Sequence, residues 1–291
     1  MDKYVFFALR PQHWVKNLLM FIPLIFGKKV FVFPENFKVL EGFIVFCLAS
    51  SAVYVANDLI DLKKDRAHHL KRLRPIACGK VGIFQARVLV LFLAACAAML
   101  SFGINPEFGI LILGYLIFNL AYSYFLKDIV IVDVFCLSGF FLLRIIAGTV
   151  IAKVSFSHWM IFMTALLALF LCLNKRRQEL RMLKEHVYGR RNVLAKYSLY
   201  FIDQMVAVVT SSIVIVYMLY VVDRRTVHYF GTNHLYYSMP FVYYGIFRYL
   251  YLIHKKYSSG DHTNILFQDR MMQLNIILWV NICIWVIYFG F

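Results

Sequence analysis

The sequence is poor in acidic residues and has none of the short motifs that mark common soluble enzymes. Asp and Glu number 15 against 31 Lys and Arg, so the formal net charge is +16. No GxGxxG, Walker-type or GxSxG pattern is present, so nucleotide hydrolysis and serine-hydrolase chemistry have no support. The six cysteines form no CxxC pair and the nine histidines form no HExxH pattern. Neither a disulfide framework nor a zinc site is therefore predicted.

Long apolar runs fill most of the chain. Hydrophobic residues make up 62% of it, aromatic residues 18%, and the mean hydropathy is +0.71, which excludes a soluble globular domain. We predict an all-α fold, a polytopic membrane helical bundle of about nine transmembrane helices, with residues 1–291 forming a single domain. The expected spans are residues 15–33, 40–60, 81–102, 108–125, 129–151, 159–173, 200–222, 235–253 and 274–291. Three lysines and a proline interrupt the first span, so a shallow interfacial helix is the alternative there.

Most of the basic residues lie in short loops between the expected spans. Most of them fall on the side of the membrane that holds the amino terminus, so the positive-inside rule places that side in the cytoplasm. We therefore predict a multi-pass protein of the inner (plasma) membrane. No separate soluble domain is left to form a nucleic-acid groove, so we expect no nucleic acid as a partner, and membrane lipid and phosphates account for the positive charge. The oligomeric state is left open, a homo-oligomer included.

Residues 57–75, NDLIDLKKDRAHHLKRLRP, place oxygen-bearing side chains at nearly four-residue spacing. Asn57, Asp61 and Asp65 would drift only slowly around a helix axis. Asp58 would lie within the same broad face, so these oxygen atoms are expected to converge. Magnesium prefers oxygen ligands and usually combines one or two carboxylates with the phosphates of a substrate. We therefore predict that Asp58, Asp61 and Asp65 bind magnesium, with manganese as the alternative.

The same segment continues into bases. Lys71 and Arg74 follow the acids, and carboxylates beside bases indicate a phosphorylated ligand. Asn57 and Asp58 still lie in an apolar run, where a carboxylate is costly and is by default functional. The alternative is an ordinary charged loop between two spans. We favour the site, because a loop does not require acids within an apolar run. The basic loops also place this segment on the cytoplasmic side, where phosphorylated metabolites and magnesium are available.

A second cytoplasmic segment lies where the fourth expected span turns into the fifth. Tyr122 and Lys127 can donate hydrogen bonds to a diphosphate, although interfacial snorkelling explains these residue types equally well. Asp133 lies deeper in an apolar run, and we hypothesise that it completes the metal site. Arg144 follows about three turns later, so a direct ion pair between it and Asp133 is not expected.

Two further basic segments allow two interpretations each. Lys175 and Arg176 directly follow the sixth expected span, where they either anchor it to anionic lipid or bind a phosphate. Arg10, Lys16 and Asn17, near the amino terminus, are likewise either an anchor or a set of phosphate contacts. The sequence does not separate these interpretations.

Residues 57–75 match NDxxDxxxDxxxxxKxxRP, which resembles the first signature of the UbiA-type intramembrane prenyltransferase superfamily. Within that superfamily the chain is most similar to the decaprenyl-phosphate phosphoribosyltransferase branch. The stretches that carry this similarity are RPxxWxKN at residues 10–17, YSYFLKD at 122–128 and GFFLLRIIAG at 139–148. The resemblance runs nearly end to end and implies the UbiA-like all-helical bundle.

The resemblance also implies an activity, that of a magnesium-dependent membrane glycosyltransferase. Such an enzyme moves 5-phosphoribose from phosphoribosyl diphosphate to a polyprenyl phosphate and releases diphosphate, in lipid-linked synthesis of a cell-envelope precursor. Asp58, Asp61 and Asp133 are then the expected catalytic residues. The residues expected to bind substrate are Lys16, Asn17, Asn57, Lys71, Arg74, Tyr122, Lys127, Lys175 and Arg176.

Two alternatives belong to other classes of protein. A UbiA-type prenyltransferase would move a polyprenyl group from polyprenyl diphosphate to an aromatic acceptor and is expected to carry a second DxxxD motif. Asp128 and Asp133 are instead five residues apart, which disfavours it. A transporter that uses intramembrane acids is disfavoured because the acids cluster with bases at the membrane edge, away from the midplane.

Overall fold

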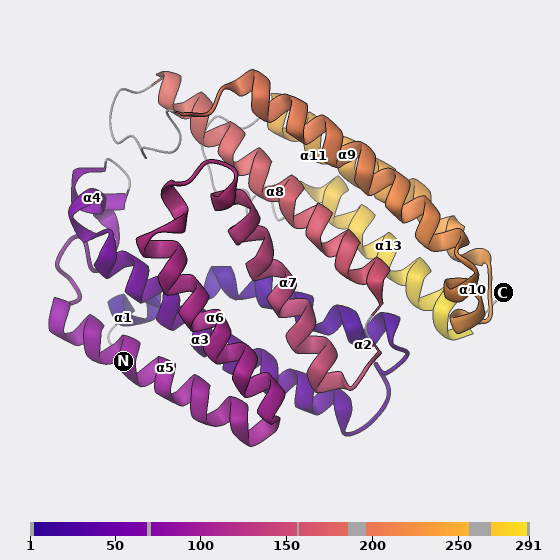
Figure 1. Cartoon of the computed structure of the whole chain (residues 1–291), viewed down its shortest axis with the longest axis horizontal. Helices are drawn as coiled ribbons and strands as arrows, with labels where there is room; N and C mark the ends of the chain where they lie inside the picture. Colours follow the sequence, from indigo (N-terminus) through magenta and orange to yellow (C-terminus); the bar gives the residue numbers. More distant parts are fainter. Residues whose placement is uncertain (1–2, 69–70, 156, 186–195, 256–268, 290–291) are drawn as a thin grey trace. The chain divides into compact units, whose positions relative to one another are not determined.

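The computed structural model describes residues 3–68, 71–155, 157–185, 196–255 and 269–289, and all regular secondary structure in these ranges is helical (Figure 1). The described residues fall into two compact units, the first ending at Ser155 and the second beginning at Ser157. The expectation of a single domain over residues 1–291 stays a prediction.

The first unit is built on four long helices, α3, α5, α6 and α7. Helix α3 contacts α5, α6 and α7, and α6 contacts both α5 and α7 (Figure 1). About its core lie short helices at the amino terminus and in the loops. The bounds are α1 Lys3–Ala8, η1 Pro11–Phe21, α2 Ile22–Phe26, α3 Glu35–Ile60, α4 Leu62–Ala67, η2 Lys71–Leu73, α5 Ile83–Ile104, α6 Pro106–Tyr124, η3 Leu126–Asp128 and α7 Val132–Ala152.

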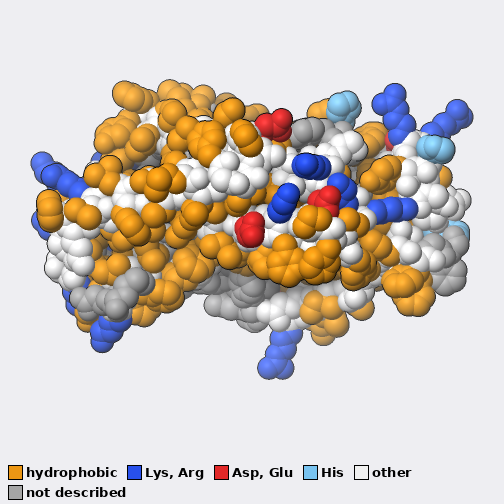
Figure 2. Space-filling view, turned by 90° about the horizontal axis from the view of Figure 1, so that it is seen from below, with side chains coloured by type: hydrophobic (Ala, Val, Ile, Leu, Met, Phe, Trp, Pro, Cys, Tyr) orange, Lys and Arg blue, Asp and Glu red, His pale blue; other side chains and the backbone are white. Residues whose placement is uncertain are grey.

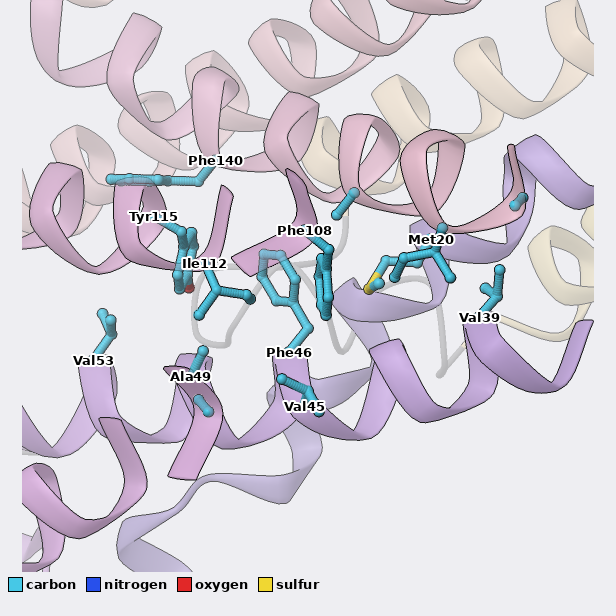
Figure 3. Packing of buried hydrophobic residues seen from close by; sticks show 14 of the residues in the cluster. Met20, Val39, Val45, Phe46, Ala49, Val53, Phe108, Ile112, Tyr115 and Phe140 are labelled. Atoms are coloured by element: carbon cyan, nitrogen blue, oxygen red, sulfur yellow. The ribbon is translucent and has the colours of Figure 1, made fainter. Parts of the chain in front are cut away.

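Aromatic and aliphatic side chains of α3, α6 and α7 form the core of this unit (Figure 3). The ring of Tyr115 lies 4.8 Å from that of Phe46 and 5.8 Å from that of Phe140, measured between centroids. Met20 of the 3-10 helix η1 joins the same cluster. A side chain at Gly148 would collide with the backbone oxygen of Met20, so this glycine allows η1 to lie directly against α7.

The second unit consists of α8 His158–Glu185, α9 Leu199–Val222, α10 Arg224–Phe230, η5 His234–Ser238, α11 Met239–Lys255 and α13 Arg270–Phe289. Helix α9 contacts α8 and α11, and α11 contacts α13. Asp269 starts α13, because its carboxylate accepts a hydrogen bond of 2.8 Å from the backbone N–H of Met272. The same carboxylate binds the guanidinium of Arg248 at 2.8 and 3.2 Å, which ties α13 to α11.

The polytopic all-helical membrane bundle is confirmed. Seven of the described helices are long and apolar enough to cross a membrane, namely α3, α5, α6, α7, α8, α9 and α13. The two other expected spans are broken or shorter: residues 15–33 are divided between η1 and α2, and residues 235–253 between η5 and α11. Pro23 is the second residue of α2, and α11 has 17 residues. The count of such helices is thus seven in the described part of the chain, where we expected about nine.

The surface agrees with a lipid environment. Hydrophobic side chains cover most of the face shown in Figure 2. The most apolar part of α3 is 61% buried, whereas that of α5 is only 17% buried, so α5 lies at the edge of its unit. Large apolar residues are exposed along α5, among them Phe84, Leu91 and Phe92. An exposed apolar surface of this extent is typical of contact with lipid.

Asn105 caps α6, and this suggests a stability test. Its Oδ1 accepts hydrogen bonds from the backbone N–H groups of Glu107 at 2.7 Å and Phe108 at 3.4 Å. Asn105→Ala is expected to lower the free energy of unfolding by about 1 kcal/mol, because two helix-terminal N–H groups lose their acceptor. Thermal unfolding in detergent, followed by circular dichroism, measures this. Asn105→Asp keeps the acceptor and should unfold like the wild type; equal losses in both variants would contradict the capping role.

Candidate active site

The predicted acids lie where α3 passes into α4. Helix α3 ends at Ile60, Asp61 has φ −89° and ψ 8°, and α4 begins at Leu62. The expected span, residues 40–60, ends at the same residue as α3, and Asp61 separates α3 from α4. Backbone hydrogen bonds from Asp61 to Asn57 at 2.9 Å and from Asp65 to Asp61 at 2.8 Å keep the four-residue spacing across the break. The acids therefore stay at the same end of α3.

Each of the three acids is paired with a base. Asp58 Oδ1 accepts from Arg10 Nη2 at 2.5 Å and from Arg74 Nη1 at 3.0 Å. The same Arg74 Nη1 binds Asp65 Oδ2 at 2.6 Å, so it bridges two acids. Lys127 Nζ binds Asp61 Oδ1 at 2.8 Å. The structure thus brings together acids and bases from four segments, and we call these six side chains the acid–base cluster.

The acids of this cluster differ in exposure. The side chains of Asp58 and Asp65 are 3% and 4% exposed, whereas that of Asp61 is 24% exposed. Asp58 Oδ2 is buried and has no hydrogen-bond partner among the residues that the structure describes. A buried carboxylate oxygen normally has a partner, so this atom is suited to a cation.

The cluster fits a hard divalent metal by chemistry but is not arranged as a finished metal site. Its donors are carboxylate oxygens, which magnesium prefers. Within the described ranges, no three His, Cys, Asp or Glu side chains are grouped so that they could hold a metal ion. The acids are engaged with bases instead. A metal ion that binds Asp58, Asp61 or Asp65 must therefore compete with Arg10, Arg74 and Lys127.

Arg10 reaches the cluster from an unusual backbone conformation. Its φ of 54° and ψ of 60° lie in the left-handed region, and it precedes Pro11. Non-glycine residues rarely adopt such angles, and a following proline restricts the backbone further. Burial lowers the pKa of the Arg10 guanidinium below its ordinary value, and the neighbouring Asp58 carboxylate opposes this shift.

The next set of predicted residues lies at the end of α6, in η3 and at the start of α7. Lys127 is buried in η3, and Asn57 Oδ1 accepts a hydrogen bond from Ser123 Oγ of α6. Tyr122 is buried, with its ring 5.7 Å from that of Phe140. Asp133 is fully buried in the first turn of α7. This segment is thus joined to the acid end of α3 through Ser123–Asn57 and Lys127–Asp61.

Asn17 lies elsewhere in the first unit, against α7. It is fully buried, and its Oδ1 accepts from Arg144 Nε at 2.8 Å. Its Nδ2 lies 3.2 Å from both Cys47 Sγ and Ser50 Oγ of α3. Arg144 also donates to the carbonyl of Phe140 at 2.5 Å and to the hydroxyl of Tyr115 at 3.4 Å. Asn17 therefore connects η1 to α3 and α7, and its predicted contact with substrate stays a prediction.

The remaining predicted residues lie outside the acid–base cluster. Lys16 is in η1 and Lys71 begins η2. Lys175 and Arg176 are in α8 of the second unit, where Arg176 is fully buried and its Nη1 binds Glu179 Oε2 at 2.5 Å. The phosphate-binding role of Lys175 and Arg176 stays a prediction.

Sequence reasoning left three polar contacts unassigned. Arg10 was an anchor or a phosphate contact, and the structure pairs it with Asp58. The contact of Ser123 with Asn57 was not expected, because serine has no distinctive pattern in an apolar helix. Arg177, next to the predicted pair in α8, binds Asp203 of α9 at 2.5 Å. Of these residues, only Arg10 could have been singled out from the sequence, because it lies in the RPxxWxKN stretch.

Comparison with known proteins agrees with this fold. The model of the UbiA prenyltransferase family matches residues 20–277. The decaprenyl-phosphate phosphoribosyltransferase of Mycolicibacterium smegmatis is 30% identical over 293 residues, covering 97% of this chain and 92% of that protein. The protein of the same name from Mycobacterium tuberculosis strain H37Rv is 30% identical over 277 residues, covering 94% and 90%.

Among solved structures, a UbiA homologue from Archaeoglobus fulgidus bound to GPP and Mg2+ has a similar fold. Its TM-score is 0.72 at 17% sequence identity, and the match covers 98% of this chain and 99% of that one. At this identity the likeness concerns the arrangement of helices alone. It supports the helical bundle that the sequence predicts.

Proposed function

The chain belongs to the UbiA prenyltransferase family, and from this premise we propose that it transfers 5-phosphoribose from phosphoribosyl diphosphate to a polyprenyl phosphate. It is a membrane transferase of that family. The observation that carries the finer proposal is the acid–base cluster, in which three carboxylates and three bases meet at one end of α3. Carboxylates suit a metal ion and bases suit phosphates, so the cluster suits a metal-bound diphosphate.

The relatives support the choice of substrates. Two proteins named decaprenyl-phosphate phosphoribosyltransferase resemble this chain at 30% identity over more than nine-tenths of its length. We propose that phosphoribosyl diphosphate binds at the acid–base cluster and that the lipid phosphate is the acceptor. We further propose that the cluster faces the cytoplasm, because the loops on its side of the membrane are the most basic.

The proposed reaction is a displacement at the anomeric carbon of the ribose. An oxygen of the polyprenyl phosphate forms the new bond to this carbon, while the bond to the diphosphate oxygen breaks and its electron pair leaves with the diphosphate. The attacking phosphate is already an anion and needs no strong general base. Catalysis then rests on orienting the two substrates and on stabilising the leaving group.

The residues of the first unit divide these tasks. Asp58, Asp61 and Asp65 would hold magnesium, which when bound neutralises charge on the diphosphate. Lys71, Arg74 and Lys127 donate to phosphate oxygens, and Asn57 and Tyr122 orient the ribosyl diphosphate. Asp133, buried at the start of α7, favours positive charge on the ribose as the bond breaks.

The experiment that tests this proposal is the transfer of radiolabelled phosphoribose into lipid. Purified protein, given phosphoribosyl diphosphate labelled in the ribose, polyprenyl phosphate and magnesium, is expected to move label into the organic-extractable fraction. A chelator should abolish the transfer, because the diphosphate would lose its metal partner. No transfer, together with activity on polyprenyl diphosphate and an aromatic acid, would instead assign the chain to the prenyltransferases.

A further inference from the structure

The charges of the acid–base cluster balance within the chain itself. Three carboxylates carry three negative charges, and Arg10, Arg74 and Lys127 carry three positive charges at 2.5 to 3.0 Å. A divalent ion added alone would leave this partly buried cluster with an excess of two positive charges, which is costly. A complex of the metal with diphosphate brings negative phosphate oxygens, to which the displaced bases can bind.

Arg10 is the member of the cluster that is best placed for such an exchange. Among the residues that the structure describes, Arg10 forms an ion pair with Asp58 alone, whereas Arg74 bridges Asp58 and Asp65. The Arg10 guanidinium lies 5.4 Å from the ring of Tyr54, a residue one helical turn before Asp58. The Arg10 side chain is 18% exposed. It can therefore leave Asp58 without breaking a second ion pair.

The backbone of Arg10 is held in place while its side chain remains exchangeable. The carbonyl of Leu9 accepts from Ser51 Oγ at 3.0 Å, and Ser51 Oγ accepts from Trp14 Nε1 at 3.0 Å. These two bonds fix the residues on either side of the left-handed turn to α3. A strained conformation that is supported in this way is common where a side chain must be positioned for function.

We infer that Arg10 is a displaceable counter-ion of Asp58, so that the acid–base cluster takes up a divalent metal together with diphosphate and resists the metal alone. Arg10 competes with the metal for the charge of the Asp58 carboxylate and, once displaced, binds the diphosphate through its planar guanidinium. The inference deepens the proposed function and rests on its assignment of metal and diphosphate to this cluster.

The test is equilibrium dialysis of the purified full-length protein in detergent, with radioactive manganese as the metal probe and labelled inorganic diphosphate as the anion probe. Arg10→Gln is expected to bind manganese alone about tenfold more tightly than the wild type, because a competing charge is removed. The same variant is expected to bind diphosphate about tenfold more weakly at saturating manganese. Arg10→Lys should lie between Arg10→Gln and the wild type in both measurements.

The matched control is Arg72→Gln, which removes the same charge from an exposed position in η2. Both of its affinities should stay within about twofold of the wild type, because an exposed charge is screened by salt. If Arg10→Gln and Arg10→Lys bind manganese alone no more tightly than the wild type, the counter-ion role is overturned. That role also fails if Arg72→Gln reproduces the effects of Arg10→Gln.

Failure of the proposed function gives a different pattern. Manganese and diphosphate would then still bind together and respond to Arg10→Gln, but the purified protein would not transfer labelled phosphoribose to lipid. If the wild type binds neither probe in any combination, the acid–base cluster is not a metal–diphosphate site and the inference is overturned as well.

Discussion

Asp61→Asn is expected to lower the rate of phosphoribosyl transfer by about 100- to 1,000-fold while the helical fold persists. Asp61 lies at the break between α3 and α4, and among the three acids its side chain is the most exposed, at 24%. The amide has nearly the same shape as the carboxylate but lacks the charge that would hold a metal ion and that now pairs with Lys127. The transfer assay with purified variant measures the rate, and circular dichroism reports the helical content.

Glu41→Gln provides a matched control for this loss. Glu41 is an exposed acid near the opposite end of the same helix, so the same change of acid to amide is made far from the cluster. Transfer by this variant should remain within about twofold of the wild type. Near-normal transfer by Asp61→Asn would refute the metal-site assignment, and an equal loss in Glu41→Gln would show that the effect is not local.

Arg144→Met is expected to lower the free energy of unfolding by about 3 kcal/mol. Arg144 is buried in α7 and donates hydrogen bonds to Asn17, to the carbonyl of Phe140 and to Tyr115. Its guanidinium also lies 5.1 Å from the ring of Phe46. Methionine fills much of the space but leaves the buried Asn17 oxygen without its donor, which costs free energy. The midpoint of thermal unfolding in detergent measures the loss.

The control for this substitution is Arg87→Met. Arg87 is exposed on α5, so the change of charge and volume is the same but no buried hydrogen bond is lost. Its unfolding midpoint should match that of the wild type. If both variants are equally stable, Arg144 does not secure η1 against α7, and the connection through Asn17 contributes little to the fold.

The helices were predictable because membrane spans depend on local composition. Apolar runs long enough to cross a bilayer are visible in one stretch of sequence, and seven of those expected occur as single long helices. The first expected span was the exception. Pro23 and the lysines on either side of it divide this segment between a 3-10 helix and a short α-helix, which hydropathy alone does not reveal.

The acids of the cluster were also predictable, whereas their partners were less so. Helical spacing groups Asp58, Asp61 and Asp65 within one segment. Arg10 is 48 residues from Asp58, and Lys127 is 66 residues from Asp61, so their pairing depends on how α1, η1 and η3 pack against the end of α3. No local periodicity encodes such contacts.

Asn17 shows the limit of assigning roles by residue type. The sequence left it as an anchor or a phosphate contact, and the structure adds a third fact, that it is buried beside Arg144. The sequence feature that indicates this contact is Arg144, because an arginine within an apolar run requires buried hydrogen-bond acceptors. Which segment provides them depends on Gly148 and the close approach of η1, and only the packed structure reveals this.

The left-handed backbone at Arg10, with φ 54°, and that at Ile131, with φ 71°, bear on laboratory evolution of this enzyme. Glycine at either position would relax the chain, so a screen for heat resistance alone would favour it. At position 10 the same change would delete the guanidinium that meets Asp58. A screen for heat resistance alone would therefore remove the Arg10 side chain from the acid–base cluster. Such a screen should select for heat resistance and activity together.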